Sequence, residues 1–559
     1  MRLFYFILLF LGATLLAGGA SQEQLGSREH GSQDLGQDRQ VNLEGDTQLV
    51  AGGREGRRKL SVLLVASMFI GHQFPLIALG EELVRRGHRV VMIGPVMEGS
   101  SFPLPRLPES VGIEFIESAK IPQEGMRQMS RVGGNVTSFL HLLFNSWKNL
   151  DRNTTSNYAV LTRRIVERMN ASEWDYAVVD ISIASVLYTV FQLWGPEKGM
   201  VNYSPLPLLV PLPHWPFPVM MSSFTENMSF LERLINSLIF YPMHKMGELF
   251  AVYALRMLDP EVDTRGIGNA MMEVVGLKSP VLFNTVVGFD YPKTILPLQH
   301  YVGPMFLKKQ SPLAPDLSDW LEGRPDQSVV YISMGSTAEL TPLQARALLE
   351  GVVAETSYSV VWALRESNRY VLEGVDLNPE RVILAGWVAQ FTLLQHPSIA
   401  MAILHCGIGG VQEALYHQIP VICLPYGFDQ FDTAVRLQSQ GLGIRLLPSG
   451  VSRQKVGEAV TSIEKGKFSI KVRRVSKLLR SAGGAERAAD LVELYVEVGN
   501  HHGIPAFIKY QWNWVQYHNV DVRVVILVLM VLMGWVSVKL CRCCCRRCCC
   551  RSSHKTKQE

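Results

Sequence analysis

Cysteine is nearly absent from most of this 559-residue chain. Seven of the nine cysteines lie between Cys541 and Cys550, which leaves Cys406 and Cys423 for everything before them. Two cysteines cannot build the disulfide framework of a small secreted scaffold, so that class of protein is excluded. Both residues lie at the ends of short apolar runs, and we predict that they are buried free thiols.

The chain also lacks a strong charge imbalance. It has 54 Lys and Arg against 50 Asp and Glu, a formal net charge of +4, and most of the basic excess lies close to the C-terminal end. A surface for nucleic acid is therefore not expected. No cluster of carboxylates suggests a metal site, and no internal repeat of short fixed period is visible. We expect neither a metal nor a cofactor.

Long apolar runs are few, and two of them lie near the ends of the chain. Residues 1–20 combine Arg2, an apolar core and small residues, which is typical of a secretory signal peptide. Residues 21–58 are rich in Gln, Gly and charge, so we predict a disordered leader. Residues 520–541 form a predicted transmembrane helix, preceded by a juxtamembrane segment over 501–519 whose aromatic residues suit a membrane interface.

The basic, cysteine-rich tail over 542–559 sets the predicted orientation. Lys and Arg next to a span favour the cytoplasmic side, which places the bulk of the chain in the lumen. Tail cysteines are candidates for palmitoylation, and Lys555 and Lys557 resemble an endoplasmic reticulum retrieval signal. We therefore predict a single-pass type I protein of the endoplasmic reticulum membrane. The predicted lumenal glycosylation sites are four sequons, at Asn135, Asn153, Asn170 and Asn227. A fifth sequon, at Asn202, is left out because it abuts an apolar run.

The N-terminal domain is predicted over 59–304 and begins with a parallel strand–helix–strand unit. His72 is predicted in the loop after its first strand, where a lone histidine is more often structural than catalytic. A second short strand over 176–179 ends in Asp180. Ligands bind beyond the carboxyl ends of such strands. The two side chains could therefore form a base and its orienting partner.

Four further segments complete the expected layout. Residues 206–221 are rich in Pro, Trp, Phe and Met, which favours an apolar wall of a binding pocket over a loop on the membrane face. Residues 224–258 are predicted to form an amphipathic helix. A Pro-rich stretch over 305–328 is the predicted linker, and 329–500 is the predicted C-terminal α/β domain.

A glycine-rich turn is the centre of the C-terminal domain. An apolar strand over 399–404 ends at His405, a glycine cluster follows, and then come a helix over 411–417 and a second strand. Unpaired N–H groups at a helix N-terminus bind anions, and glycines let a phosphate approach them. Such glycines also serve tight packing alone, so the turn by itself does not decide between the two. The glycines are Gly407, Gly409 and Gly410.

The stretch from Trp387 to Gln430 resembles the signature segment of the UDP-glycosyltransferases, in particular the membrane-bound UDP-glucuronosyltransferase branch. The matching residues are Trp387, Gln390, Leu393, Leu394, His396, Pro397, His405, Gly407, Glu413, Ala414, Pro420, Pro425, Asp429 and Gln430. The resemblance implies two doubly wound, Rossmann-like α/β domains that face each other across a cleft, the GT-B fold, followed by one transmembrane helix.

The resemblance also implies a role for each matching residue. Trp387 would stack on uracil and Gln390 would hydrogen-bond to it. His405, the glycine turn and Ser336 would hold the diphosphate. Glu413 would take the ribose, and Asp429 with Gln430 would contact the donor sugar. His72 and Asp180 would be the catalytic base and its partner.

The chain departs from the family pattern at several positions. Gly409 stands where the family usually has Asn, so the backbone must supply more of the phosphate grip. The other departures are Ile408, Phe391, Thr433 and the sequence Gly71-His72-Gln73 around the predicted base.

We therefore expect an enzyme that transfers a sugar from a UDP-sugar to a small lipophilic acceptor with inversion at the anomeric carbon. Glucuronic acid is the leading sugar and glucose the alternative. A non-catalytic binding protein of the same fold, and a UDP-sugar epimerase or hydrolase, are the other classes that remain open. The expected partners are the UDP-sugar, the acceptor and a membrane. The sequence leaves a homo-oligomer open.

Overall fold

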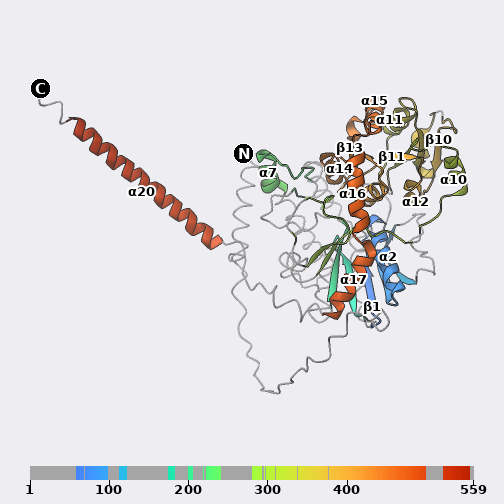
Figure 1. The fold of residues 1–559 in the computed structure, drawn as a ribbon, viewed down its shortest axis with the longest axis horizontal. Coiled ribbons are helices and arrows are strands. Elements are labelled where there is room, and N and C mark those ends of the chain that lie inside the picture. Colours follow the sequence, from blue (N-terminus) through green and yellow to red (C-terminus); the bar gives the residue numbers. More distant parts are fainter. Residues whose placement is uncertain are drawn as a thin grey trace, which may run out of the picture. The chain divides into compact units, whose positions relative to one another are not determined.

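A computed structural model describes the chain in fifteen segments (Figure 1). These are residues 58–67, 70–97, 112–121, 174–182, 199–205, 218–219, 222–240, 280–291, 295, 298–308, 310–335, 338–375, 377–427, 429–498 and 520–553. The predicted signal peptide, nearly all of the leader and of the Pro-rich wall, and the juxtamembrane segment lie outside them. So do Ser336, Asn135, Asn153 and Asn170.

The first sheet has seven strands, in the order β3-β2-β1-β4-β5-β6-β7, and every described pair is parallel. Its strands are β1 (Ser61–Val65), β2 (Arg89–Met97), β3 (Ile113–Ile121), β4 (Tyr176–Asp180), β5 (Gly199–Ser204), β6 (Val281–Phe283) and β7 (Gln299–Tyr301). The continuous apolar run of β1 is buried from Val62 to Val65, as expected for a strand covered on both faces. The chain order reverses between β1 and β4, which is the switch point where doubly wound folds bind ligands.

Helix α2 (Ile70–Arg85) follows β1 and buries Leu76, Leu79 and Leu83 on its sheet-facing side. The predicted helix is confirmed, but it begins earlier than expected. His72 therefore lies in the first turn of α2, and its predicted place in a loop was wrong. The sequence does not mark this start because Pro75 and Gly71, which usually indicate a break, both lie inside the helix.

The predicted helix over 224–258 is only partly present. Residues 222–229 are not helical, and α7 (Phe230–Ile235) continues into a short π-helix, η4 (Asn236–Phe240). The start at Phe230 is set by a capping box, in which the Ser229 hydroxyl accepts from the Glu232 N–H and the Glu232 carboxylate accepts from the Ser229 N–H. Residues 241–279 lie outside the described segments.

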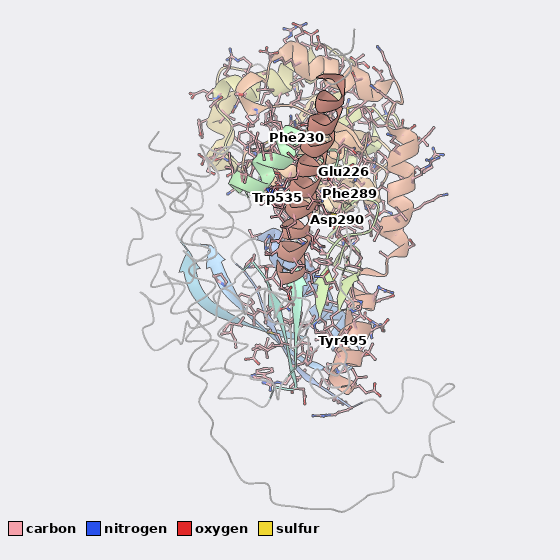
Figure 2. All side chains as sticks on the ribbon, turned by 90° about the vertical axis from the view of Figure 1, so that its left-hand side faces the viewer. Glu226, Phe230, Phe289, Asp290, Tyr495 and Trp535 are labelled. Carbon is pink, nitrogen blue, oxygen red and sulfur yellow. A yellow bond between two sulfur atoms is a disulfide. The ribbon has the colours of Figure 1, made fainter. Side chains whose placement is uncertain are left out.

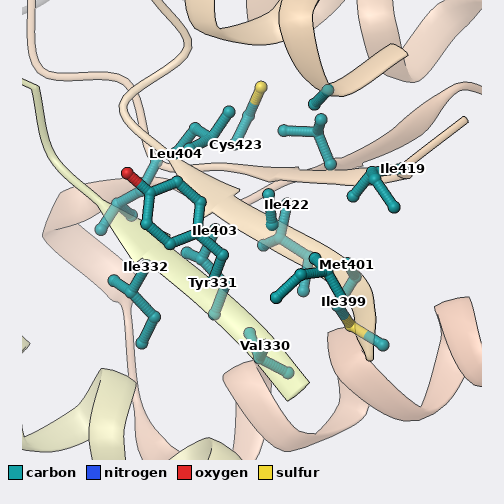
Figure 3. Packing of buried hydrophobic residues seen from close by; sticks show 14 of the residues in the cluster. Val330, Tyr331, Ile332, Ile399, Met401, Ile403, Leu404, Ile419, Ile422 and Cys423 are labelled. Carbon is teal, nitrogen blue, oxygen red and sulfur yellow. The ribbon is translucent and has the colours of Figure 1, made fainter. Parts of the chain in front are cut away.

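The second sheet has six parallel strands in the order β10-β9-β8-β11-β12-β13. They are β8 (Val329–Ser333), β9 (Ser359–Ala363), β10 (Val382–Ala385), β11 (Ile399–Leu404), β12 (Val421–Cys423) and β13 (Gly443–Arg445). The strand predicted over 399–404 and the second strand predicted after the glycine-rich turn are thereby confirmed. The order again reverses, between β8 and β11, whose apolar side chains pack together in Figure 3.

Helices cover this second sheet. They are α10 (Pro315–Glu322), α11 (Pro342–Val353), α12 (Gln390–Leu394), α13 (Ile408–Tyr416), α14 (Gln430–Ser439), α15 (Arg453–Glu464) and α16 (Ser469–Ser481). Helix α10 falls within the predicted linker, yet its Leu317 and Leu321 are buried in the second core. Within the predicted linker, only the residues on either side of α10 therefore connect the two domains.

Helix α17 (Gly484–Glu497) packs on the first sheet although it follows the second in sequence. Ala485, Ala488, Ala489 and Val492 are buried in the first core, and α17 lies against α2 in Figure 1. A buried ion-pair cluster holds the two helices: the Arg86 guanidinium contacts Glu82 at 2.8 Å and Glu493 at 2.9 Å. Helix α17 therefore completes the domain of the first sheet, although its residues come after those of the second sheet.

Helix α20 (Val520–Ser553) contains one stretch, Asp521–Lys539, that is long and apolar enough to cross a membrane, with a mean hydropathy of 2.2. Its apolar side chains are exposed throughout. The helix continues to Ser553, beyond the predicted end at 541, so the first residues of the predicted tail are helical.

Candidate active site

The first switch point carries the predicted histidine–aspartate pair. The Nδ1 atom of His72 lies 3.1 Å from the Asp180 Oδ2 atom. Asp180 ends β4 and is completely buried, whereas the His72 side chain keeps 13% of its surface exposed. Two hydroxyl groups also lie near Nδ1, those of Ser67 at 3.1 Å and Ser182 at 3.3 Å. The structure thus brings together two residues that are 108 positions apart.

The charge of Asp180 determines which ring nitrogen carries the proton. Burial by itself raises the pKa of Asp180, but the facing His72 and the hydrogen bonds from Ser182 outweigh it and hold this pKa below its ordinary value. The Oδ1 atom accepts from the Ser182 N–H at 2.9 Å and from its hydroxyl at 2.7 Å. An ionised carboxylate only accepts, so the imidazole donates from Nδ1 and keeps its lone pair on Nε2.

Gln73 explains one departure from the family pattern. Its side chain is buried, and its amide nitrogen donates to the Ser67 carbonyl at 2.8 Å and to the Pro95 carbonyl at 3.1 Å. These bonds tie the start of α2 to the ends of β1 and β2. Gln73, Ser67 and Ser182 position the pair, and the sequence analysis missed Ser67 and Ser182 because short hydroxyl residues after strands carry no distinctive signal.

The second switch point carries the glycine turn and His405. The His405 ring lies between two glycines: a β-carbon on Gly335 would come within 2.4 Å of the ring, and one on Gly407 within 2.7 Å. Gly335 also has a left-handed backbone, with φ +66°. Only glycine suits position 335 on both counts. The two strand-end turns after β8 and β11 therefore hold this imidazole in one place.

His405 is a neutral imidazole with one unused polar atom. Burial lowers its pKa to about 4, and its Nδ1 atom is buried without a hydrogen-bond partner among the described residues. Gly407 caps α13, and Gly409 and Gly410 lie in its first turn. The turn thus offers helix N–H groups beside a neutral ring, an arrangement that suits an anion.

Gln390 and Glu413 form a hydrogen-bonded chain with Tyr331. The Gln390 amide donates to the Glu413 carboxylate at 2.6 Å and accepts from the Tyr331 hydroxyl at 3.1 Å. Burial raises the pKa of Glu413 to about 7, although the bond from Gln390 opposes it. Glu413 lies in the second turn of α13, later than predicted. Trp387 is 55% exposed, which leaves much of its surface accessible.

Asp429 and Gln430 begin α14. The Gln430 side-chain oxygen accepts from the N–H groups of Tyr426 and Gly427, at 2.8 and 3.1 Å. This oxygen thereby fixes the loop before α14. The amide N–H groups of Gln430 could donate to a sugar. Burial raises the pKa of Asp429, and the charge on His72 opposes this shift. A positive charge on the His72 ring would therefore favour the ionised form of Asp429.

Cys406 and Cys423 are joined in a disulfide, with their Cα atoms 5.4 Å apart. The prediction of two free thiols was wrong. It rested on the small number of cysteines, which argues against a disulfide framework but not against a single bond. Parallel pairing of β11 with β12 brings the two strand ends together, and that pairing cannot be read from sequence alone.

His88 follows helix α2. It is buried, its Nδ1 accepts from the Leu60 N–H at 3.2 Å, and its Nε2 lies 2.9 Å from Glu493. Its partner comes from α17, some 400 positions later in the chain, so no local pattern could have indicated the contact.

The remaining predicted sites stay predictions. Asn227 lies in an exposed turn, where an oligosaccharide could be attached. Within the described segments, no group of three or more His, Cys, Asp or Glu side chains could hold a metal ion.

Comparison with known proteins assigns the chain to a family. The family model described as UDP-glucoronosyl and UDP-glucosyl transferase matches residues 61–555. The chain belongs to this family. It is a glycosyltransferase of the UDP-glucuronosyl and UDP-glucosyl type, and the resemblance found in the signature segment is confirmed.

The relatives match over nearly their whole length. The chain is 22% identical to human UDP-glucuronosyltransferase 1A1 over 517 residues, covering 87% of this chain and 92% of that protein. It is 24% identical to UDP-glucuronosyltransferase 1-2 of Rattus norvegicus over 528 residues, covering 89% and 94%.

Solved structures confirm the GT-B fold. The calicheamicin glycosyltransferase CalG4 matches with a TM-score of 0.54 and 20% identity, over 79% of this chain and 99% of that one. Os79 from O. sativa, solved in complex with UDP, matches with a TM-score of 0.53 and 16% identity, over 78% and 100%.

Proposed function

We propose that this glycosyltransferase moves glucuronic acid from UDP-glucuronic acid to a hydroxyl or carboxyl group of a small lipophilic acceptor, with inversion and with His72 as the base. The observation that carries the proposal is the His72–Asp180 pair at 3.1 Å, within electrostatic reach of Asp429. In this proposal a base from the first sheet and sugar ligands from the second would meet where the acceptor and the donor come together.

In this mechanism the His72 Nε2 atom takes the proton of the acceptor hydroxyl. The acceptor oxygen then forms a bond to the anomeric carbon while the bond from that carbon to the UDP oxygen breaks on the opposite face. The proton stays on His72, where the buried charge of Asp180 stabilises the imidazolium. UDP leaves with the electron pair of the broken bond.

The leaving diphosphate gains negative charge as the bond breaks. The N–H groups at the start of α13 would face it, and His405, neutral with its pKa near 4, would donate one hydrogen bond from its ring. Ser336 would add a hydroxyl. Because neutral donors supply this stabilisation, we expect activity to survive treatment with EDTA.

Five residues would bind the uracil, the ribose and the sugar of the UDP-sugar. The exposed Trp387 ring would stack on uracil, and Gln390 would turn part of its amide to the base. Glu413 would accept from the ribose hydroxyls, and Asp429 with the Gln430 amide would bind hydroxyls of the sugar. Glucose is the second candidate, because the chain departs from the family pattern at Ile408, Gly409, Phe391 and Thr433.

The proposed setting is the lumenal face of the endoplasmic reticulum membrane. Helix α20 supplies one candidate span, and the Cys406–Cys423 disulfide suits an oxidising compartment. Asn227→Gln should remove one glycosidase-sensitive mass increment if that site is lumenal. A chain whose mass is unchanged by glycosidase would contradict the orientation.

The decisive experiment compares microsomes that contain the wild-type chain with microsomes that contain His72→Ala. Each receives a mixed pool of phenols and steroids with UDP-glucuronic acid or, separately, UDP-glucose. Mass spectrometry of the conjugates identifies the transferred sugar. We expect a glucuronide that disappears in the variant. UDP-sugar binding without a conjugate from any pool would instead favour a non-catalytic binding protein.

A further inference from the structure

The two loops that would hold the diphosphate and the sugar of the donor arise from neighbouring strands. The turn after β11 carries His405 and would bind the diphosphate. The loop after β12 carries Asp429 and would bind the sugar. The two strands pair in parallel from Ala402 with Val421 to Leu404 with Cys423. The spacing of the loops therefore depends on how the carboxyl ends of β11 and β12 are held together.

A covalent bond holds them at that point. The disulfide joins Cys406, which directly follows His405, to Cys423, the last residue of β12 (labelled in Figure 3). Both cysteines are completely buried. The bond thus lies beneath both loops, one residue from the predicted phosphate ligand and on the strand that leads to the sugar loop.

Cys406 has a backbone conformation that needs such support. Its φ is +63°, in the left-handed region, which residues other than glycine adopt at a cost in free energy. This turn directs the His405 ring into the space between Gly335 and Gly407. If Cys406 relaxed to an ordinary φ, the ring would have to move, because those two glycines leave no alternative position of the same fit.

The strand pairing itself does not require the bond. The Leu424 N–H donates to the Leu404 carbonyl at 2.8 Å, and the Ala402 N–H donates to the Pro420 carbonyl at 3.1 Å. Reduction would leave these hydrogen bonds in place. Its effect should therefore fall on the turn at Cys406 and His405 rather than on the sheet.

We propose that the Cys406–Cys423 disulfide positions the donor-binding loops, so that its reduction weakens UDP-sugar binding while the fold and the base remain intact. The proposal rests on the proposed function, since it needs a UDP-sugar at these loops. In the reduction, a dithiol such as dithiothreitol supplies two electrons and two protons, closes to its own cyclic disulfide and leaves two thiols on the enzyme. Neither cysteine touches substrate, so both are positioning residues.

The first test establishes the bond and its effect on donor affinity. Peptide mapping of the full-length folded enzyme without reductant should find the two cysteines in one linked pair. Free thiols at both positions would overturn the proposal. Kinetics of Cys406→Ala, Cys423→Ala and the double variant should then show KM for the UDP-sugar raised by about tenfold with kcat within about twofold, because ground-state and transition-state binding are lost together.

The pattern among the three variants separates a bond from two independent packing defects. Each single substitution already breaks the disulfide, so the double variant should be no worse than either one, a non-additive result. Two effects on KM that multiply in the double variant would refute the bond as the acting unit. So would an unchanged KM in variants that fold.

Reduction of the folded wild-type enzyme covers the case in which the variants do not fold. Dithiothreitol should raise the Kd for UDP by about tenfold, and oxidised glutathione should restore it. A chain with all seven tail cysteines changed to serine should respond in the same way, since its Cys406–Cys423 bond is intact. A Kd that dithiothreitol leaves unchanged, with both thiols shown to be free by alkylation, would overturn the proposal. A wild-type enzyme that binds no UDP-sugar at all would contradict the proposed function instead.

Discussion

Raising the pH from about 6 to about 8 should strengthen UDP-sugar binding through Glu413. Burial raises the pKa of this carboxyl from 4.5 to about 7, so it is largely protonated at the lower pH and largely ionised at the higher one. The ribose hydroxyls would donate to the carboxylate. Because the ionised form is then the one that binds, a fall in pH converts the site to a form that binds poorly.

The size of the effect follows from the fraction of ionised Glu413. The apparent Kd equals the intrinsic Kd divided by that fraction, so with a pKa near 7 it should be about tenfold higher at pH 6 than at pH 8. His405 adds nothing to this change, since its pKa near 4 keeps it neutral over the whole range. A UDP-sugar is the right probe, because its diphosphate is esterified at both ends and does not titrate here.

Isothermal titration calorimetry of a UDP-sugar across this pH range is the assay. Binding should release a proton near pH 6, which is visible as a heat that depends on the ionisation enthalpy of the buffer. Glu413→Gln is the matched control, because glutamine keeps the shape and an acceptor oxygen but does not ionise. Its Kd should be flat with pH. A wild-type Kd that is equally flat, or a variant that keeps the full pH dependence, would refute the assignment.

The same carboxyl should affect the stability of the ligand-free protein. Because its folded pKa lies above the unfolded one, the folded state binds more protons between pH 4.5 and about 7. The contribution of Glu413 is therefore full below the unfolded pKa and is lost as the pH rises through the folded one, by roughly 3 kcal/mol at most. Glu413→Gln should remove this loss, so its melting temperature should exceed that of the wild type above pH 7 and not below pH 5.

Three further outcomes are expected. Asp180→Asn should lower kcat by about 10²-fold or more with little change in KM, because the amide can hold the wrong His72 tautomer and carries no charge to stabilise the imidazolium; an unchanged kcat in steady-state assays would remove the pair from the mechanism. Gly335→Ala should weaken UDP binding by about tenfold or more in calorimetry, because the new methyl group would overlap the His405 ring and the backbone is left-handed; full affinity would show that the ring is not fixed in place. A chain that ends before α20 should be found in the supernatant after alkaline extraction of membranes while the full chain stays in the pellet, and co-sedimentation of both would exclude α20 as the sole anchor.

Most of the two-sheet architecture could be predicted from the sequence. Strands such as those at 329–333 and 399–404 are continuous apolar runs bounded by turn residues, a pattern typical of parallel strands covered on both faces. The histidine and aspartate of the first switch point could be proposed because each follows or ends such a run. That they meet, with Nδ1 3.1 Å from a carboxylate oxygen, depends on β1 pairing with β4, which is a tertiary property.

The features that escaped prediction depend on tertiary contacts and not on local sequence patterns. His88 is buried because Glu493 arrives from α17 to accept its proton. The disulfide forms because β11 pairs with β12. Helix α2 begins at Ile70, before Pro75, because Gln73 bonds to the Ser67 and Pro95 carbonyls and stabilises the first turns. Local propensity favours a loop there, and the tertiary bonds override it.

The helices that carry the donor residues also hold the two sheets together. On α14, Asp432 accepts from the Ser223 N–H at 2.9 Å. Two turns after Asp429, the completely buried Arg436 lies 3.7 Å from Asp290, the loop residue labelled in Figure 2.

On α13, the Gln412 amide donates to the Asn284 carbonyl at 2.7 Å. Each helix thus packs its side against residues that follow strands of the first sheet, and its N-terminus carries residues predicted to bind the donor. A shift of either helix on donor binding must strain these contacts or move the segments that follow β5 and β6, and β5 pairs with β4, the strand that ends in Asp180. Because the base and the donor ligands are joined through packed, hydrogen-bonded elements, their relative position is set by the interface as much as by either sheet. In the proposed mechanism, this coupling is how residues on two cores would converge on one anomeric carbon.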